Sequence, residues 1–294
     1  MTPLDFDFLR GLLRKRSGLV LAADKQYLVE SRLLPVARRA GLANLGALVG
    51  ALKAAGDGEL TNVVVEAMAT NESSFFRDKT PFEYFRTIVM PALLAARRTS
   101  RAIRIWCAAA STGQEPYSLA MCLKQMERDI AGWRIEILAT DLCSEVLEKA
   151  RQGLYSQFEV QRGLPIQALI KHFTQTGELW QLAPDIRAMV KFRQLNLLSN
   201  FSNLGIFDLI FCRNVLIYFD QPTKIDVLER LARVSAGDGF LVLGAAETVV
   251  GLTDTFKAVG DRHGLYVPNV RPPKPVFQPD KPAAPRLVAV NGGR

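Results

Sequence analysis

The chain of 294 residues is poor in cysteine and histidine. Its four cysteines are spread out with no C-x-x-C pair, which argues against a disulfide framework. Its two histidines stand far apart, so we expect neither a metal site nor a histidine-based catalytic triad. No apolar run reaches the roughly 18 residues that a membrane span needs, and the N-terminus does not resemble a signal peptide. We therefore expect a cytoplasmic protein with no stable membrane insertion.

Glycine-rich phosphate-binding motifs are missing as well. The chain has no G-K-[ST] phosphate loop and no complete G-x-G-x-x-G pattern. Their absence argues against a NAD-dependent oxidoreductase, which would need such a loop to hold the pyrophosphate of its cofactor. The net charge of +8 would suit a nucleic acid, a membrane surface or an acidic protein as partner. No Asn/Asp-Pro-Pro-Tyr-type motif for gripping a flipped base follows a predicted strand. The basic charge alone therefore does not lead us to favour a nucleic-acid methyltransferase, and we expect no nucleic acid as partner.

The most informative stretch runs from residue 104 to residue 118. It starts apolar and β-prone, turns abruptly into small residues and continues as a predicted helix, which is typical of a nucleotide-binding βαβ unit. Small residues allow the backbone to approach a ligand closely, although only Gly113 is a glycine. A second predicted strand, 133–141, ends in Asp141, whose carboxylate can accept hydrogen bonds from both hydroxyls of a ribose. A ligand with adenosine but no phosphate, such as S-adenosylmethionine, fits best; an ordinary strand, turn and helix without a ligand is the alternative.

The chain divides into four parts. Residues 1–76 read as four short amphipathic helices, with basic residues gathered on the first two, which leaves open a partner-binding face or a solvated one. Residues 77–98 predict a linker helix. Residues 99–268 predict an α/β domain. Its alternation of strands and helices is interrupted at about 156–190 by a short helix and a small antiparallel insertion. The tail, 269–294, is rich in proline and lysine and should be disordered.

Two further segments point to a cleft. The near-continuous apolar run at 207–220 predicts a central strand covered on both faces. Because ligands bind at the carboxyl ends of such strands, we expect Arg213, Asn214 and Tyr218 near the site. The polar loop at 70–78 has two interpretations: a loop with two aromatic anchors in the core, or a cleft loop that holds a carboxylate through its Asn, Ser and Arg side chains.

Taken together, five segments resemble the chemotaxis receptor methyltransferases, the CheR family. The segments are residues 70–77, 106–118, 139–141, 196–197 and 211–219, and their order and spacing also fit that family. The resemblance covers residues 1 to about 268. It implies a Rossmann-like class I methyltransferase domain with a small antiparallel β insertion, preceded by a small all-α N-terminal domain. It also implies methyl transfer from S-adenosylmethionine to glutamate side chains of chemotaxis receptors, which gives methyl esters in sensory adaptation.

The same resemblance assigns residues. At the cofactor it places Asn71, Ser73, Arg77, Glu115, Asp141, Asn196, Leu197, Asn214 and Val215. At the transfer site it places Arg77 and Tyr218. Arg32, Arg38 and Arg39, from the basic helices, are expected to dock on the acidic helical bundle of the receptor. No metal is expected, and the protein is expected to be a monomer.

This sequence departs from the family pattern in three places. Ser73 stands where threonine is more usual, which keeps the hydroxyl, and Gln114 stands where an acid is often found. The insertion looks shorter than in members that dock on a peptide at the receptor's C-terminal end, so we favour a peptide-independent enzyme. A non-catalytic adaptor that keeps the fold is a further alternative. Five intact residues argue against it: Asn71, Arg77, Glu115, Asp141 and Tyr218.

Overall fold

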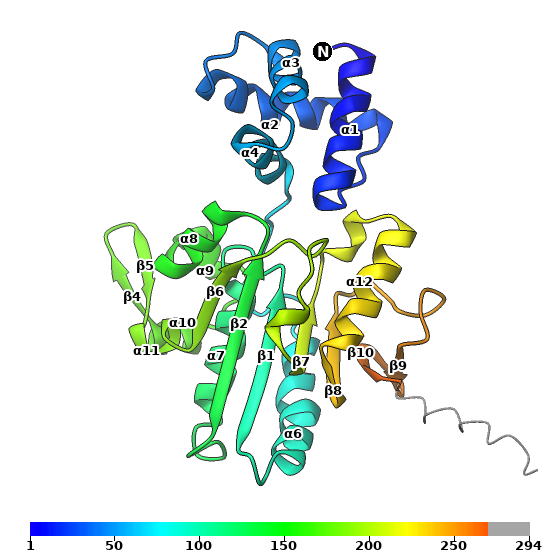
Figure 1. Cartoon of the computed structure of the whole chain (residues 1–294). Coiled ribbons are helices and arrows are strands. Elements are labelled where there is room, and N and C mark those ends of the chain that lie inside the picture. The colour runs from blue at the N-terminus through cyan, green and yellow to red at the C-terminus, as the bar shows by residue number, and fades with distance from the viewer. Residues whose placement is uncertain (270–294) are drawn as a thin grey trace, which may run out of the picture.

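Four helices form a bundle at the N-terminus of the computed structural model, which describes residues 1–269 (Figure 1). Thr2 and Asp5 form a reciprocal capping box at the start of the first helix, and Gly18 ends that helix in a left-handed conformation (φ 75°). Each helix buries one apolar face in a shared core, to which Leu9 and Leu33 contribute. The helices are α1 (Pro3–Ser17), α2 (Gln26–Arg39), α3 (Leu45–Ala55) and α4 (Glu59–Met68), with a 3₁₀ turn η1 (Ala23–Lys25) before α2. The predicted all-α N-terminal domain is confirmed.

The rest of the described chain is built on a seven-stranded sheet with the order β6-β2-β1-β7-β8-β10-β9. Neighbouring strands run parallel from β6 to β8, and β10 pairs antiparallel with β8 and β9. The strands are β1 (Ala102–Ala108), β2 (Arg134–Asp141), β6 (Val190–Gln194), β7 (Phe207–Cys212), β8 (Ser235–Leu243), β9 (Phe256–Val259) and β10 (Arg262–Pro268). This confirms the Rossmann-like α/β class.

Helices cover both faces of this sheet. Side chains alternate along β1, so that Ile105 and Cys107 face a core shared with α7, while Trp106 and Ala108 face a core shared with α12. The helices are α5 (Thr80–Tyr84), a π-helical turn η2 (Phe85–Val89), α6 (Met90–Ala96), α7 (Gln114–Gln125), α8 (Ser144–Gln152) and α12 (Gln221–Arg233). The first three follow one another without a break and occupy the place of the predicted linker helix.

The strand predicted over 207–220 is wrong beyond Cys212. Asn214 takes a left-handed conformation (φ 57°), and a 3₁₀ turn η4 (Leu216–Tyr218) follows. The apolar run continues past the strand because Leu216 and Phe219 pack into the core beside α12. An apolar run records burial, which a buried turn shares with a strand, so it does not mark where the strand ends.

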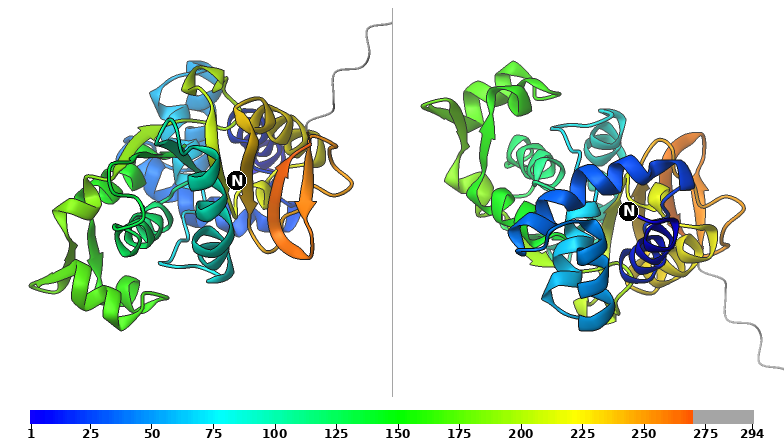
Figure 2. Two further views of the ribbon diagram at one scale, coloured as in Figure 1. Left: turned by 90° about the horizontal axis from the view of Figure 1, so that it is seen from below. Right: turned by 90° about the horizontal axis from the view of Figure 1, so that it is seen from above.

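A smaller antiparallel sheet, in the order β3-β5-β4, stands out to one side of the molecule (Figure 2). It is made of β3 (Leu154–Ser156), β4 (Phe173–Thr176) and β5 (Leu179–Leu182), with α9 (Gln157–Gln161), α10 (Ile166–His172) and α11 (Pro184–Arg187) between and after its strands. This confirms the predicted antiparallel insertion. At Val190, where the insertion was predicted to end, the chain pairs in parallel with β2.

The N-terminal bundle lies over the carboxyl ends of the parallel strands (Figures 1 and 2). On one side, Glu66 of α4 accepts hydrogen bonds from the backbone and hydroxyl of Ser144 and from the amide of Gln194. On the other side, Arg14 of α1 forms an ion pair of 2.6 Å with Asp220. The bundle therefore covers the edge of the sheet at which ligands bind in folds of this class.

In residues 1–269 no helix is both long and apolar enough to cross a membrane. In the same range no group of three or more His, Cys, Asp or Glu side chains is placed to hold a metal ion. The four cysteines are buried and free. The tail predicted over 269–294 lies, from residue 270 onward, outside the described residues.

Candidate active site

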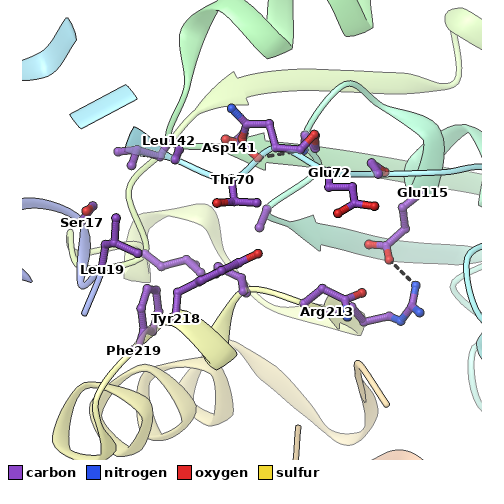
Figure 3. Close-up of a pocket in the computed structure, with 18 of the residues that line it drawn as sticks. Ser17, Leu19, Thr70, Glu72, Glu115, Asp141, Leu142, Arg213, Tyr218 and Phe219 are labelled. Carbon is purple, nitrogen blue, oxygen red and sulfur yellow. Dashed lines mark hydrogen bonds and ion pairs between the residues drawn. The ribbon is translucent and has the colours of Figure 1, made fainter. Parts of the chain in front are cut away.

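A cleft lies between the N-terminal bundle and the carboxyl ends of β1, β2, β6 and β7 (Figure 3). Its open space is about 990 Å³, solvent at its mouth included. All residues that the sequence analysis assigns to the cofactor or to the transfer site line it: Asn71, Ser73, Arg77, Glu115, Asp141, Asn196, Leu197, Asn214, Val215 and Tyr218. They come from five separate stretches of the chain, which the fold brings together at one edge of the sheet.

Strained backbone surrounds this cleft. Among the described residues, seven other than glycine have positive φ, and six of them lie in the loop after α4, in the turn after β1 or directly after β7: Phe76, Asp78, Lys79, Ala109, Ser111 and Asn214. Each such conformation costs roughly 1–3 kcal/mol and persists only where the surrounding structure enforces it. Strain of this kind clusters at functional sites, so its concentration here supports the assignment of the cleft.

Asp141 ends β2 with a carboxylate that is almost buried (7% exposed). One oxygen, Oδ2, accepts a hydrogen bond from the backbone N–H of Ser111 (2.8 Å), and Oδ1 accepts one from the backbone N–H of Cys143 (3.0 Å). Burial raises the pKa of Asp141, and the backbone donors offset part of that rise. Because each carboxylate oxygen can accept more than one hydrogen bond, the group is held in place and can still accept from a ligand.

A buried ion-pair network involves Arg213, at the end of β7. The side chain of Arg213 is 1% exposed and donates to Glu115 Oε2 (2.7 Å), to Asp78 Oδ2 (2.6 Å) and to the carbonyl of Arg77 (3.1 Å). Burial raises the pKa of Glu115, and the neighbouring guanidinium offsets part of that rise. The network joins β7, α7 and the loop after α4 in one cluster of charges at the cleft, and Figure 3 shows its Glu115–Arg213 pair.

The loop between α4 and α5 is both anchored in the core and exposed to the cleft. Phe75 is fully buried, and its carbonyl lies so close to Gly163 that a Cβ there would come within 2.2 Å of the oxygen. The Ser111 hydroxyl donates to the carbonyl of Asn71 (2.9 Å), which ties the loop to the turn after β1. The aromatic side chains of this segment therefore anchor the loop, and its polar ones line the cleft; that they hold a carboxylate stays a prediction.

Two further lining residues depend on the N-terminal bundle. Tyr218 has its ring in the cleft with the hydroxyl directed inward (Figure 3), and its carbonyl accepts a hydrogen bond from the backbone N–H of Val20 (2.9 Å). Asn196 donates to the carbonyl of Arg16, at the end of α1 (2.5 Å), and accepts from the backbone N–H of Leu198 (2.9 Å). The position of α1 therefore affects both walls of the cleft.

The sequence analysis missed several lining residues. Thr70 lies inside the predicted loop 70–78 and Leu142 directly follows the predicted strand 133–141, so both could have been included. Ser17 and Leu19 reach the cleft from the end of α1 (Figure 3). No local pattern marks these two, because only the packing of α1 against the loop after β7 brings them to the site.

The three arginines predicted to dock on a receptor have different surroundings. Arg32 donates to the carbonyls of Met68 (2.7 Å) and Ala69 (3.2 Å), at the C-terminal end of α4, where a cation is favoured. Arg38 and Arg39, at the end of α2, are exposed. Arg32 thus has a structural function, whereas Arg38 and Arg39 present their charge to solvent.

Comparisons with known proteins cover both parts of the chain. The family model described as CheR methyltransferase, SAM binding domain, matches residues 71–265, and that described as CheR methyltransferase, all-alpha domain, matches residues 4–68. The chain is 42% identical over 265 residues to chemotaxis protein methyltransferase 1 of Pseudomonas aeruginosa (89% of this chain, 96% of the relative). It is 41% identical over 266 residues to chemotaxis protein methyltransferase Cher2 of Pseudomonas putida (89% and 96%). It is 38% identical over 262 residues to the chemotaxis protein methyltransferase of Vibrio parahaemolyticus (88% and 94%).

Proposed function

Because the chain belongs to the CheR methyltransferase family and methylates chemotaxis receptors with S-adenosylmethionine, we propose that it methylates the side-chain carboxylate of a receptor glutamate. The product is a glutamyl methyl ester. The observation that carries this proposal is that neither histidine lines the cleft, while its buried acids Glu115 and Asp141 are held by hydrogen bonds. A hydroxyl or ammonium acceptor has to lose a proton, whereas a glutamate with a pKa of about 4.3 is already ionised at neutral pH.

The donor set of the cleft fits S-adenosylmethionine. Asp141 offers the fixed carboxylate that the two ribose hydroxyls require. Leu142, Leu197 and Val215 provide apolar surface for the adenine ring. The methionine end, which carries both an ammonium and a carboxylate, is proposed to meet the polar residues of the opposite stretches: Asn71, Ser73, Arg77 and Glu115. Neither the family match nor the relatives support a NAD-dependent oxidoreductase.

When bound, S-adenosylmethionine supplies a methyl group activated by a positively charged sulfur. The residues of the chain contribute by orienting the accepting carboxylate in line with that bond and by excluding water. We propose that the hydroxyl of Tyr218 and the guanidinium of Arg77 donate hydrogen bonds to the accepting carboxylate. The N-terminal bundle, through Ser17 and Leu19, closes the cleft on the side of α1.

The nature of the modified group can be tested directly. The protein is incubated with S-adenosylmethionine radiolabelled in the methyl group and with a panel of receptor cytoplasmic fragments. We expect a label that mild alkali releases as methanol, because esters hydrolyse in base and N-methyl groups do not. In the same assay, Tyr218→Phe should lower kcat by about tenfold and leave the Kd for S-adenosylhomocysteine nearly unchanged, because the ring that lines the cleft stays in place.

Other results of this assay would count against the proposal. An alkali-stable label would exclude the glutamate ester. Binding of S-adenosylhomocysteine without transfer to any fragment would support the alternative of a non-catalytic adaptor. Turnover equal to that of the wild type in Tyr218→Phe would remove Tyr218 from the transfer step.

We propose that the acidic receptor bundle docks on the exposed basic end of α2. Reversing both charges, with Arg38→Glu and Arg39→Glu, should raise the KM for the receptor fragment about tenfold, because attraction becomes repulsion. The Kd for S-adenosylhomocysteine, measured by calorimetry, should not change, since neither residue lines the cleft. The matched control reverses Lys257 and Arg262, which are exposed on β9 and β10. An equal rise of KM in the control would show that net charge, and not this surface, matters.

A further inference from the structure

The side chain of Glu247 accepts hydrogen bonds from backbone amides of the loop that follows β7. The residue lies just after β8 and is 5% exposed. Its carboxylate accepts hydrogen bonds from five backbone N–H groups at N···O distances of 2.7 to 3.3 Å: those of Asn214, Val215, Leu216, Ile217 and Gly244. Four of these donors are consecutive in the chain. A side chain from one strand end thus determines the path of the loop at the neighbouring strand end.

The chemistry of this arrangement requires a carboxylate. The loop has no ladder partner for its amides, and buried N–H groups without an acceptor are costly. A carboxylate offers two oxygens with about four lone-pair sites, whereas an amide side chain offers one oxygen and two competing donors. The same bonds hold Asn214 in its left-handed conformation.

The close approach also explains a glycine. A Cβ on Gly244 would lie 2.7 Å from Glu247 Oε2 and 2.9 Å from Asn214 Nδ2. Any other residue at this position would push the carboxylate and the loop apart. Gly244 and Glu247 therefore act together on the loop.

We propose that Glu247 is a positioning residue that shapes the loop 214–218 before the cofactor binds. Glu247 does not line the cleft, but Asn214, Val215 and Tyr218 of that loop do. The proposal rests on the roles proposed above for these three residues. The order that one carboxylate gives to this loop can be measured on the protein without any cofactor.

The wild-type chain provides the first test and needs no variant. In hydrogen–deuterium exchange without ligand, the amides of residues 214–217 should exchange at least about a hundredfold more slowly than in an unfolded chain. Saturation with S-adenosylhomocysteine should slow them further by less than about tenfold. Exchange near the unfolded rate until S-adenosylhomocysteine is added would show that the ligand orders the loop, and would overturn the proposal.

The variant Glu247→Gln provides the second test. Its amide group turns a donor toward the loop, so exchange at 214–217 should become at least about tenfold faster and the Kd for S-adenosylhomocysteine should rise about tenfold. Gly244→Ala, which keeps the carboxylate but displaces it, should have the same two effects. The matched control is Glu159→Gln, because Glu159 also accepts from a backbone N–H, that of Ser156, away from the cleft. This control should lower stability and leave both readouts unchanged.

The exchange rates and Kd values test the positioning role of Glu247 independently of the proposed methyl transfer. Unchanged exchange in Glu247→Gln, or faster exchange with an unchanged Kd, would overturn the positioning role. If Glu247→Gln does not fold, the wild-type exchange and Gly244→Ala decide. A negative methyl-ester assay would alter none of these readouts, so the two proposals fail independently.

Discussion

Replacing Arg213 by methionine should lower the free energy of unfolding by about 3–5 kcal/mol, because removing one partner of a buried ion pair leaves the other charge buried alone. The guanidinium is 1% exposed and holds both Glu115 and Asp78. Methionine keeps much of the apolar volume, so a packing defect contributes little. The Kd for S-adenosylhomocysteine should rise more than about a hundredfold, since the loop after α4 loses the bonds to Asp78 and to the carbonyl of Arg77. Denaturant unfolding and calorimetry measure the two effects.

The pH dependence distinguishes lost pairing from lost packing. Burial already raises the pKa of Glu115, and removal of the guanidinium should raise it further. A carboxyl whose pKa is higher in the folded than in the unfolded chain binds more protons when folded, so its contribution to stability falls as the pH rises between the two pKa values. The destabilisation by Arg213→Met should therefore be smaller at about pH 5 than at about pH 8.

Two further variants serve as controls for Arg213→Met. The double variant Arg213→Met, Glu115→Gln should recover part of the lost stability, because no uncompensated charge remains at Glu115. Arg97→Met breaks ion pairs with Asp208 and Asp238 near the start of β7, away from the cleft, and should leave the Kd for S-adenosylhomocysteine unchanged. A single variant as stable as the wild type at every pH would contradict this account of the network.

The features that the sequence predicted correctly are those that local chemistry determines. The turn after β1 is built from small residues, and the next strand ends in an acid, so Asp141 can be found from pattern alone. The helices of the N-terminal bundle were predictable because their apolar positions recur at helical spacing and Gly18 ends the first of them. The residues that the family resemblance assigns also line the cleft, because the matching segments include the ends of the parallel strands.

What the sequence did not reveal depends on contacts between distant segments. Glu247 looks like an ordinary acid in a turn; its function appears only when the loop after β7 is folded against it. The same loop made the predicted strand too long, because buried turns are as apolar as strands. Arg32 reads as one more basic residue of α2, yet it donates to carbonyls at the end of α4. Hydrophobic periodicity carries no information about such pairings.

Asp141→Ala should weaken binding of S-adenosylhomocysteine by at least about a hundredfold. A hydrogen bond to an ionised group contributes about 1.5–3 kcal/mol, and the proposed contact includes two, one to each ribose hydroxyl. The substitution also leaves the amides of Ser111 and Cys143 without their acceptor, which loosens the strained turn after β1. The matched control is Asp208→Asn, because Asp208 is equally buried (8% exposed) but accepts from Arg97 and lies outside the cleft. That control should lower stability and keep the affinity.

A ligand change isolates the ribose contact from the general loss of order around Asp141. The wild type should bind an analogue of S-adenosylhomocysteine without the two ribose hydroxyls far more weakly than S-adenosylhomocysteine itself, because the buried carboxylate then keeps its two backbone donors but lacks those of the ribose. In Asp141→Ala the two ligands should bind with nearly the same Kd, since the acceptor for the hydroxyls is gone. If the variant still discriminates between them as strongly as the wild type, another residue holds the ribose, and the orientation proposed for the whole nucleoside in this cleft is wrong.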